Sequence, residues 1–136
     1  MYPDCFIYHF ETYQDLTTEA FVVEHFTIKG SLFLAFANPR TFTSDSIICK
    51  FSDSIRNFFL YQTLDTKEAW NVEYFTISDE HYLAVANLFK TVIYRFNGQL
   101  FTPFENIAER GWEFSFFTVD KEPYLAVCGS HFDSIY

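Results

Sequence analysis

The histidines and carboxylates are the side chains of this sequence that could support metal binding or acid–base catalysis. The histidines show neither an HExxH motif nor any other paired spacing, so the sequence predicts no metal site. They are His9, His25, His81 and His131. Most carboxylates fall in turn-like segments, where solvated surface charge is the usual role: Asp65, Glu68, Asp79, Glu80, Glu105, Glu109, Asp120 and Glu122. The sequence therefore predicts a protein without catalytic activity, and a hydrolase with two carboxylates across a central axis is the alternative.

No serine or cysteine is placed for nucleophilic catalysis. Ser130 precedes His131 but lacks the GxSxG elbow that exposes a hydrolase nucleophile. Cys5, Cys49 and Cys128 match no disulfide framework and no CxxC metal motif. A disulfide between Cys5 and Cys49 and free thiols are both open, and Cys128 is most simply a small buried residue.

The composition favours a folded β-sheet protein with an acidic surface. The chain has 136 residues, of which 49% are hydrophobic and 22% aromatic, enough to bury a core rich in β-forming residues. It carries 18 acidic and 9 basic residues, and this charge of -9 repels the phosphates of nucleic acids and anionic membranes. We expect no membrane insertion, because no apolar stretch approaches the ~20 residues of a spanning helix. The N-terminus also lacks the basic start and apolar run of a signal peptide.

Several motifs recur at intervals of roughly 43 residues, which is typical of repeat architectures. A Phe-Thr pair, a short turn and a Leu-Ala strand occupy 26–38, 75–87 and 117–129. An Ile-Tyr type motif occupies 7–10, 48–51 and 93–96 and begins again at 135–136. A third motif follows it, as Tyr13-Gln14 and Tyr61-Gln62, which we match to Pro103-Phe104. We expect repeats over 5–45, 46–90 and 91–132, with the start of a fourth at 133–136.

The apolar pattern of the repeats predicts strands that are buried on both faces of their sheet. The segment 82–86 is apolar throughout, and Ala84 and Ala86 would let a neighbouring sheet approach closely. Stacking small sheets of this kind around an axis gives a β-propeller. The sequence predicts an all-β fold of propeller-type blades, each of four antiparallel strands, in about three repeats that form a partial or open propeller. A β-sandwich is the alternative.

Some recurring residues are more simply structural than functional. Aromatic repeat positions are expected to pack between blades, and they are Tyr8, Phe26, Trp70, Phe75, Tyr94, Trp112 and Phe117. Glu24 and Glu73 share a repeat position that Ser115 fills in the third copy. An edge or surface position is favoured for them, although a repeated acid could line a channel or bind Ca²⁺. We expect no cofactor, with Ca²⁺ as the alternative.

The repeat resembles a known family. The sequence Trp-x-Val-Glu-x-Phe-x-Ile, then Tyr-Leu-Ala-Val-Ala-Asn, then Ile-Tyr-Arg-Phe-Asn-Gly is similar to the EAR repeat, also called the EPTP or epitempin repeat. The likeness is closest over 70–104 and covers essentially the whole chain in three copies. It implies extracellular seven-bladed β-propellers, as in the leucine-rich glioma-inactivated proteins. It also implies an interaction module with adhesive or signalling roles, whose partners include the ectodomains of cell-surface receptors.

The chain departs from that family pattern in ways that shape our expectations. Three repeats stand in place of seven, so we expect a fragment of a longer protein or an arc that is marginal alone, aggregates or closes by oligomerising. A purely structural fragment that needs further blades is a second alternative. The first copy has Phe21 in place of Trp and an insertion around 39–46. Because this loop is the most individual segment, we predict that Arg40 and Phe42 bind a protein partner.

Overall fold

The computed structural model describes residues 10–16, 19–39, 45–107, 111–129 and 133–136. Its strands form three antiparallel sheets, and no helix occurs in these ranges. The first sheet holds β1 (Val22–Ile28), β2 (Ser31–Ala37), β3 (Ser46–Ser52) and β4 (Asn57–Leu64). The second holds β5 (Asn71–Ile77), β6 (Glu80–Ala86), β7 (Thr91–Phe96) and β8 (Phe101–Ile107). The third holds β9 (Glu113–Val119), β10 (Glu122–Cys128) and β11 (Asp133–Ile135).

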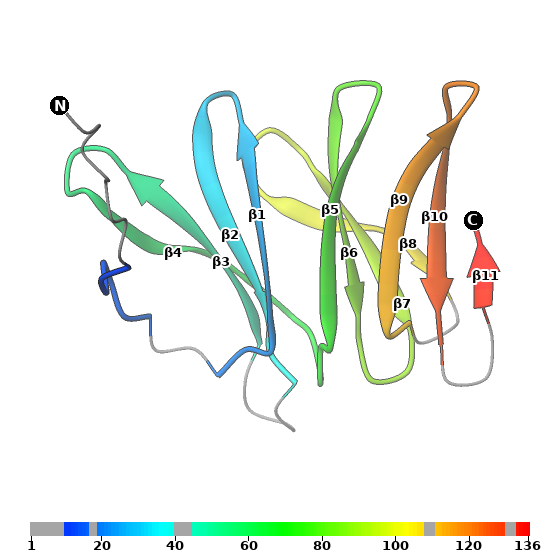
Figure 1. Ribbon diagram of the computed structural model, residues 1–136, viewed down its shortest axis with the longest axis horizontal. Coiled ribbons are helices and arrows are strands. Elements are labelled where there is room, and N and C mark those ends of the chain that lie inside the picture. Colours follow the sequence, from blue (N-terminus) through cyan, green and yellow to red (C-terminus); the bar gives the residue numbers. More distant parts are fainter. Residues whose placement is uncertain (1–9, 17–18, 40–44, 108–110, 130–132) are drawn as a thin grey trace, which may run out of the picture.

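The sheets stand side by side like the blades of an open fan (Figure 1). Neighbouring sheets approach most closely through β1, β5 and β9, the first strand of each. The predicted all-β fold of separate propeller-type blades is confirmed, and the arc is not closed. The described ranges also contain no helix long and apolar enough to span a membrane.

The first hairpin of each sheet is closed by the same kind of tight turn. The register pairs Ile28 with Ser31, Ile77 with Glu80 and Val119 with Glu122, which leaves two residues in each loop. Both loop residues have positive φ in all three turns, as in Lys29 (φ 49) and Gly30 (φ 80) of the first. Turns of this kind match the right-handed twist of the flanking strands. One backbone shape therefore appears in three different turn sequences.

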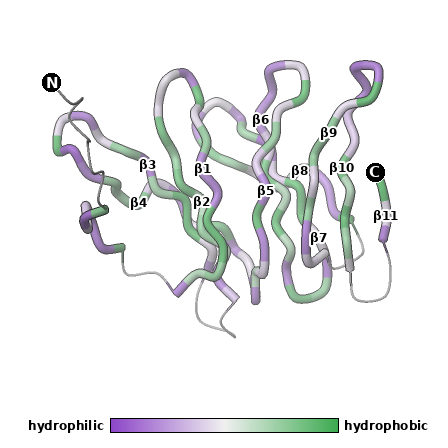
Figure 2. Tube along the Cα trace, in the orientation of Figure 1, coloured by the Kyte–Doolittle hydropathy of each residue, from purple (hydrophilic) through white to green (hydrophobic). Residues whose placement is uncertain are grey.

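Two apolar layers hold the sheets together. One lies between the first and second sheets and includes Phe26, Leu83 and Val85. The other lies between the second and third sheets and includes Ala84 and Leu125. Because residues of β6 alternate between the two layers, its Leu83, Ala84 and Val85 are all fully buried. Hydrophobic segments also run through β10 at the end of the stack (Figure 2).

The sheets are offset from the expected repeats 5–45, 46–90 and 91–132. The limit between 45 and 46 falls directly before β3, and the limit between 90 and 91 falls directly before β7. The segment 133–136, which we expect to open a fourth repeat, pairs with β10 in the third sheet, just as β3 and β7 at the start of the second and third repeats pair with β2 and β6. A repeating sequence has no intrinsic starting point, so strand pairing decides where each sheet begins.

Candidate protein-binding surface

The same aromatic contact joins the sheets at both interfaces. At the first, Phe26 stacks on Phe33 of its own sheet, and Tyr74 of the second sheet stacks on Phe26 with ring centroids 4.5 Å apart. At the second, Phe75 stacks on Tyr82, and the ring of Phe116 from the third sheet lies 4.7 Å away. Phe26 and Phe75 are consequently only 3% and 6% exposed.

The third sheet presents the same aromatic pair to solvent. Phe117 stacks on Tyr124 as its equivalents do, yet Phe117 is 37% exposed. Strand alternation and pairing put Val119 and Ile135 on this side too, and they are 51% and 66% exposed. We call these four residues the open face. It is the counterpart of a surface that the two earlier sheets bury.

An apolar pocket of about 210 Å³ lies beside the open face, between the second and third sheets. Its walls include Phe75, Tyr82 and Phe104 on one side and Leu125 and Tyr136 on the other. At the first interface Phe101 of β8 fills the corresponding place. Its ring meets Phe26 edge-on at 5.7 Å and is 2% exposed. The pocket is open because the described part of the third sheet ends at β11, without a counterpart of β8.

Side chains of β4 clamp the first sheet to the second. The Gln62 amide donates to the Phe101 carbonyl at 2.7 Å, and the Phe101 N–H donates back to the Gln62 amide oxygen at 2.9 Å. The Tyr61 hydroxyl donates to the carbonyl of Gln99. This clamp ties the fourth strand of one sheet to the fourth strand of the next.

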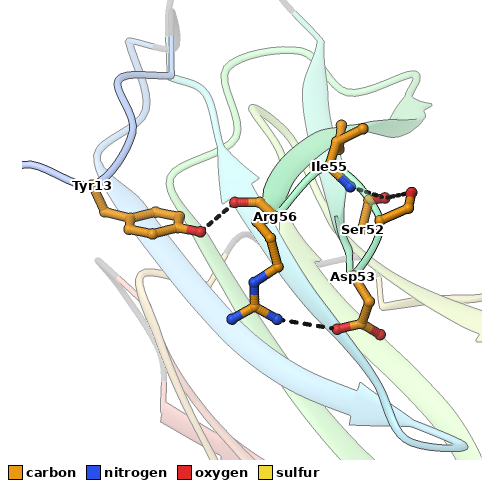
Figure 3. Close-up of polar contacts among 6 residues, drawn as sticks. Tyr13, Ser52, Asp53, Ile55 and Arg56 are labelled. Atoms are coloured by element: carbon orange, nitrogen blue, oxygen red, sulfur yellow. Dashed lines mark hydrogen bonds and ion pairs between the residues drawn. The ribbon is translucent and has the colours of Figure 1, made fainter.

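The segment 10–16 attaches to the first sheet through the same set of bonds. The Gln14 amide donates to the Phe58 carbonyl at 2.9 Å and accepts from the Phe58 N–H at 2.8 Å. The Tyr13 hydroxyl donates to the Arg56 carbonyl, as Figure 3 shows, while the Arg56 guanidinium lies 3.5 Å from Asp53. The sequence pattern groups Tyr13-Gln14 with Tyr61-Gln62 but assigns the pair no role.

The third member of that motif is shifted by one residue from our expectation. The register pairs Ile48 with Gln62 and Ile93 with Glu105, so Phe104-Glu105 is the counterpart of Tyr61-Gln62, and Pro103-Phe104 is wrong. Cation–π contacts agree, because Lys50 lies 5.6 Å from the Tyr61 ring and Arg95 lies 5.6 Å from the Phe104 ring. The irregularity is the same in both strand pairs, but the connections between the strands differ in length, since Phe51 pairs with Phe58 and Phe96 pairs with Phe101. Counting forward from the Ile-Tyr motif therefore does not find the counterpart.

A row of aromatic side chains crosses all three sheets. Phe21 lies 5.8 Å from Trp70, and Trp70 lies 5.6 Å from Trp112. The Asn71 amide adds a hydrogen bond to the Trp112 carbonyl at 2.9 Å. Phe21 and Trp112, at the two ends of the row, are 71% and 41% exposed.

Some of the other residues singled out from the sequence are described by the structure, and some are not. Tyr94 is buried, at 4% exposure. Cys49 and Cys128 have free thiols, and burial raises the pKa of Cys49. The prediction that Cys128 is buried is wrong, because it lies exposed at the end of β10 in the last sheet. Tyr8, Arg40, Phe42 and Cys5 lie outside the described residues.

The repeated carboxylates of β1 and β5 form no catalytic arrangement with a described pocket. Glu24 and Glu73 are half-buried, and burial raises the pKa of both side chains. The negative charge of Glu24 raises the pKa of Glu73 further, and a hydrogen bond with the Phe116 backbone opposes this. Neither lines the pockets found between or beside the sheets. Within the described ranges no three His, Cys, Asp or Glu side chains come close enough to hold a metal ion, and the absence of a cofactor stays a prediction.

Comparison with known proteins follows the repeats. The family model described as EPTP domain matches residues 9–50 and 57–97. The thrombospondin-type laminin G domain and EAR repeat-containing protein of mouse is 36% identical over 115 residues, covering 75% of this chain. The human protein of the same name is 36% identical over 118 residues. The chain spans 17% of the length of these two relatives.

Proposed function

Since this chain belongs to the EPTP repeat family, we propose that it serves as a non-catalytic protein-binding module of an extracellular protein. The repeat of this family is a β-propeller-like protein-interaction module. The names of the mouse and human relatives describe laminin G and EAR repeat domains and mention no enzymatic activity. We further propose an adhesive or receptor-binding role, with the ectodomain of a cell-surface protein as partner.

The open face is the observation that carries the proposal. Large apolar side chains gather on it, and a contiguous exposed patch of this kind usually marks a contact with another protein. The same aromatic pair is buried wherever another sheet follows it, at Phe26 and at Phe75. The exposed apolar side chains of the open face are therefore suited to burial against a bound protein.

Binding to the surface of intact cells tests the proposed role. We expect saturable binding of the labelled chain that disappears after the cells are treated with protease, because the partner is a protein. Binding that survives protease treatment, or that never saturates, would contradict a protein partner. Candidate cell lines are compared at the same concentration of chain, so that differences report the partner and not the ligand.

The loop that holds Arg40 and Phe42 is our proposed recognition element for that partner. The double substitution R40A and F42A should weaken cell binding by about tenfold, equivalent to roughly 1.4 kcal/mol. The matched control is F89A with K90A, an exposed aromatic residue and a cation in the equivalent connection before β7. Equal binding by both double variants would reject the loop assignment while leaving the protein-binding role in place.

A further inference from the structure

We propose that a groove between the first and second sheets binds an arginine side chain of the protein partner. The carboxylate of Asp65 and the side-chain oxygen of Asn87, which both line this groove, accept hydrogen bonds from its guanidinium group. The inference rests on the proposed function, because it takes the partner to be a protein and names the chemistry of one anchor.

The groove has a volume of about 370 Å³ and lies between β4 of the first sheet and β7 and β8 of the second. Leu64 and Asp65 line it from the first sheet, and Tyr94 lines it from β7. The connection between β6 and β7 contributes Asn87 and Lys90. Both sheets have all four strands, so this groove is a feature of a complete interface between two blades.

The side-chain oxygen of Asn87 is an unsatisfied acceptor in the wall of the groove. Asn87 is 8% exposed, and this oxygen is buried without a hydrogen-bond donor among the described residues. A buried acceptor without a donor is unfavourable, so a ligand that donates to it gains binding free energy. Asn38 holds the same repeat position in the first sheet, but Gly129 holds it in the third. The repeat therefore does not require an amide at this position in order to fold.

Uncompensated negative charge accompanies this acceptor. Asp65 is exposed, and the ion pairs among the described residues, Arg56 with Asp53 and Arg95 with Glu80, leave it unneutralised. A second carboxylate lies nearby, because burial raises the pKa of Tyr94 and the charges of Asp65 and Asp45 raise that pKa further. Lys90 is an exposed cation in the lining, yet it does not supply a donor to the Asn87 oxygen. The groove thus favours a ligand that is positively charged and rich in donors.

A guanidinium group matches these acceptors better than other cations do. It carries five N–H donors in one plane and no acceptor, so one edge can meet the Asp65 carboxylate while another N–H meets the Asn87 oxygen. An ammonium group is more strongly hydrated and lacks this planar fork. A metal ion would lack ligands, because within the described ranges no three His, Cys, Asp or Glu side chains lie close enough to hold one. Arginine is therefore the occupant that we choose.

The apolar part of the groove suits the stem of an arginine side chain. Leu64, Tyr94 and Phe101 contribute apolar walls and are 3%, 4% and 2% exposed. Arginine packs its aliphatic stem along such surfaces while its charged end stays among polar groups. Arginine is also enriched among the residues that dominate protein interfaces. The net charge of -9 on this chain further favours the approach of a partner with a cationic surface.

Nuclear magnetic resonance titration of the ¹⁵N-labelled full chain with short peptides tests the proposal. The probe is a blocked pentapeptide with one arginine between glycines. Matched peptides carry lysine, or citrulline, which has nearly the shape of arginine without its charge. We expect saturable shifts of the backbone amide signals of 62–65 and 87–94 with the arginine peptide. The lysine and citrulline peptides should bind about tenfold more weakly, because neither offers a charged planar fork.

Two substitutions that preserve shape assign the acceptors. Asp65→Asn removes a charge from an exposed residue and should weaken arginine binding about tenfold, whereas Asn87→Asp adds a charge and should tighten it. Asp53→Asn is the matched control, because it makes the same change in net charge at an exposed carboxylate outside the groove, and it should bind like the parent chain. Circular dichroism verifies that each variant is folded. Because Asp65 is exposed, its variant tests the site even where Asn87→Asp does not fold.

Each contrary outcome is distinct. Absence of saturable shifts, equal binding of the citrulline or lysine peptide, or equal binding by Asp65→Asn and Asp53→Asn would overturn the proposal. A folded Asn87→Asp variant that binds arginine no tighter would overturn the role of the amide oxygen. A chain that binds cells saturably but not the arginine peptide would overturn this inference and leave the proposed function standing. Arginine binding in the groove without saturable cell binding would do the reverse.

Discussion

The second and third sheets share a sequence pattern but differ in what surrounds them. Phe75 and Phe117 hold the same position and each stacks on a neighbouring tyrosine, yet Phe75 is 6% exposed and Phe117 is 37% exposed. The strand sequence explains the stacking within a sheet. Burial depends on whether another sheet follows, so a repeat of this kind completes its core only with its neighbours.

Removing the two rings in turn should give the largest contrast. Phe75→Ala leaves a cavity in a packed layer, so we expect the free energy of unfolding to fall by about 3–5 kcal/mol. Phe117→Ala removes a partly solvated ring and should cost about 1 kcal/mol or less. Urea unfolding of both variants at low protein concentration measures the difference. Equal losses would mean that the third sheet is covered in the isolated chain.

The close packing at the start of β9 offers a second contrast. A Cβ on Gly111 would lie 2.6 Å from Val127 Cγ1 and 2.8 Å from Phe114 Cε1, whereas Ala69 fills the equivalent place before Trp70. Gly111→Ala should therefore destabilise the chain by about 1–3 kcal/mol through overpacking. Thermal unfolding measures the change, with Gly98→Ala as a control at a turn glycine that has no atom within 4 Å but a φ of +99. A stabilised Gly111→Ala variant would show that Val127 and Phe114 do not pack closely against residue 111.

The side chains of Gln62 and Gln14 should contribute differently to the free energy of unfolding. Gln62 joins two complete sheets, whereas Gln14 attaches only the short segment 10–16 to the first sheet. Gln62→Ala releases two backbone hydrogen bonds between complete sheets and should cost about 1–2 kcal/mol. Gln14→Ala releases the same bonds, but they hold only a short segment, so the global stability should change by less than about 0.5 kcal/mol. Chemical denaturation distinguishes the two. A larger loss at Gln14 would make residues 10–16 part of the cooperative core.

The smallest effect that we predict is the pH response of Glu73. Because its pKa is raised in the folded protein, mainly by burial and then by the charge of Glu24, the native state binds more protons than the unfolded state. The contribution of Glu73 to stability is thus most favourable below the ordinary glutamate pKa of 4.5 and declines as the pH rises through the folded pKa. Glu73→Gln should flatten this decline between acidic and neutral pH. An unchanged slope in pH-dependent unfolding would place Glu73 in open water.

Much of the second sheet follows from its sequence, whereas the exposure of the third does not. The apolar run 82–86 indicates a strand covered on both faces, and β6 is one. Phe117 sits in an equally apolar pattern, so no local signal marks its exposure. The clamp at Gln14 was accessible in principle, since Phe10, Tyr13 and Gln14 repeat the spacing of Phe58, Tyr61 and Gln62. The same spacing recurs at Phe101, Phe104 and Glu105, so the sequence also carried a signal for the match to Phe104-Glu105, which the strand register confirms.

Amide hydrogen exchange, read strand by strand in one dilute sample, tests the central claim most directly. The claim is that sheets of the same pattern gain their protection from the sheets beside them. We predict strong protection throughout β5 and β6 and markedly weaker protection in β9, β10 and β11. Equal protection of the second and third sheets in dilute solution would contradict the account.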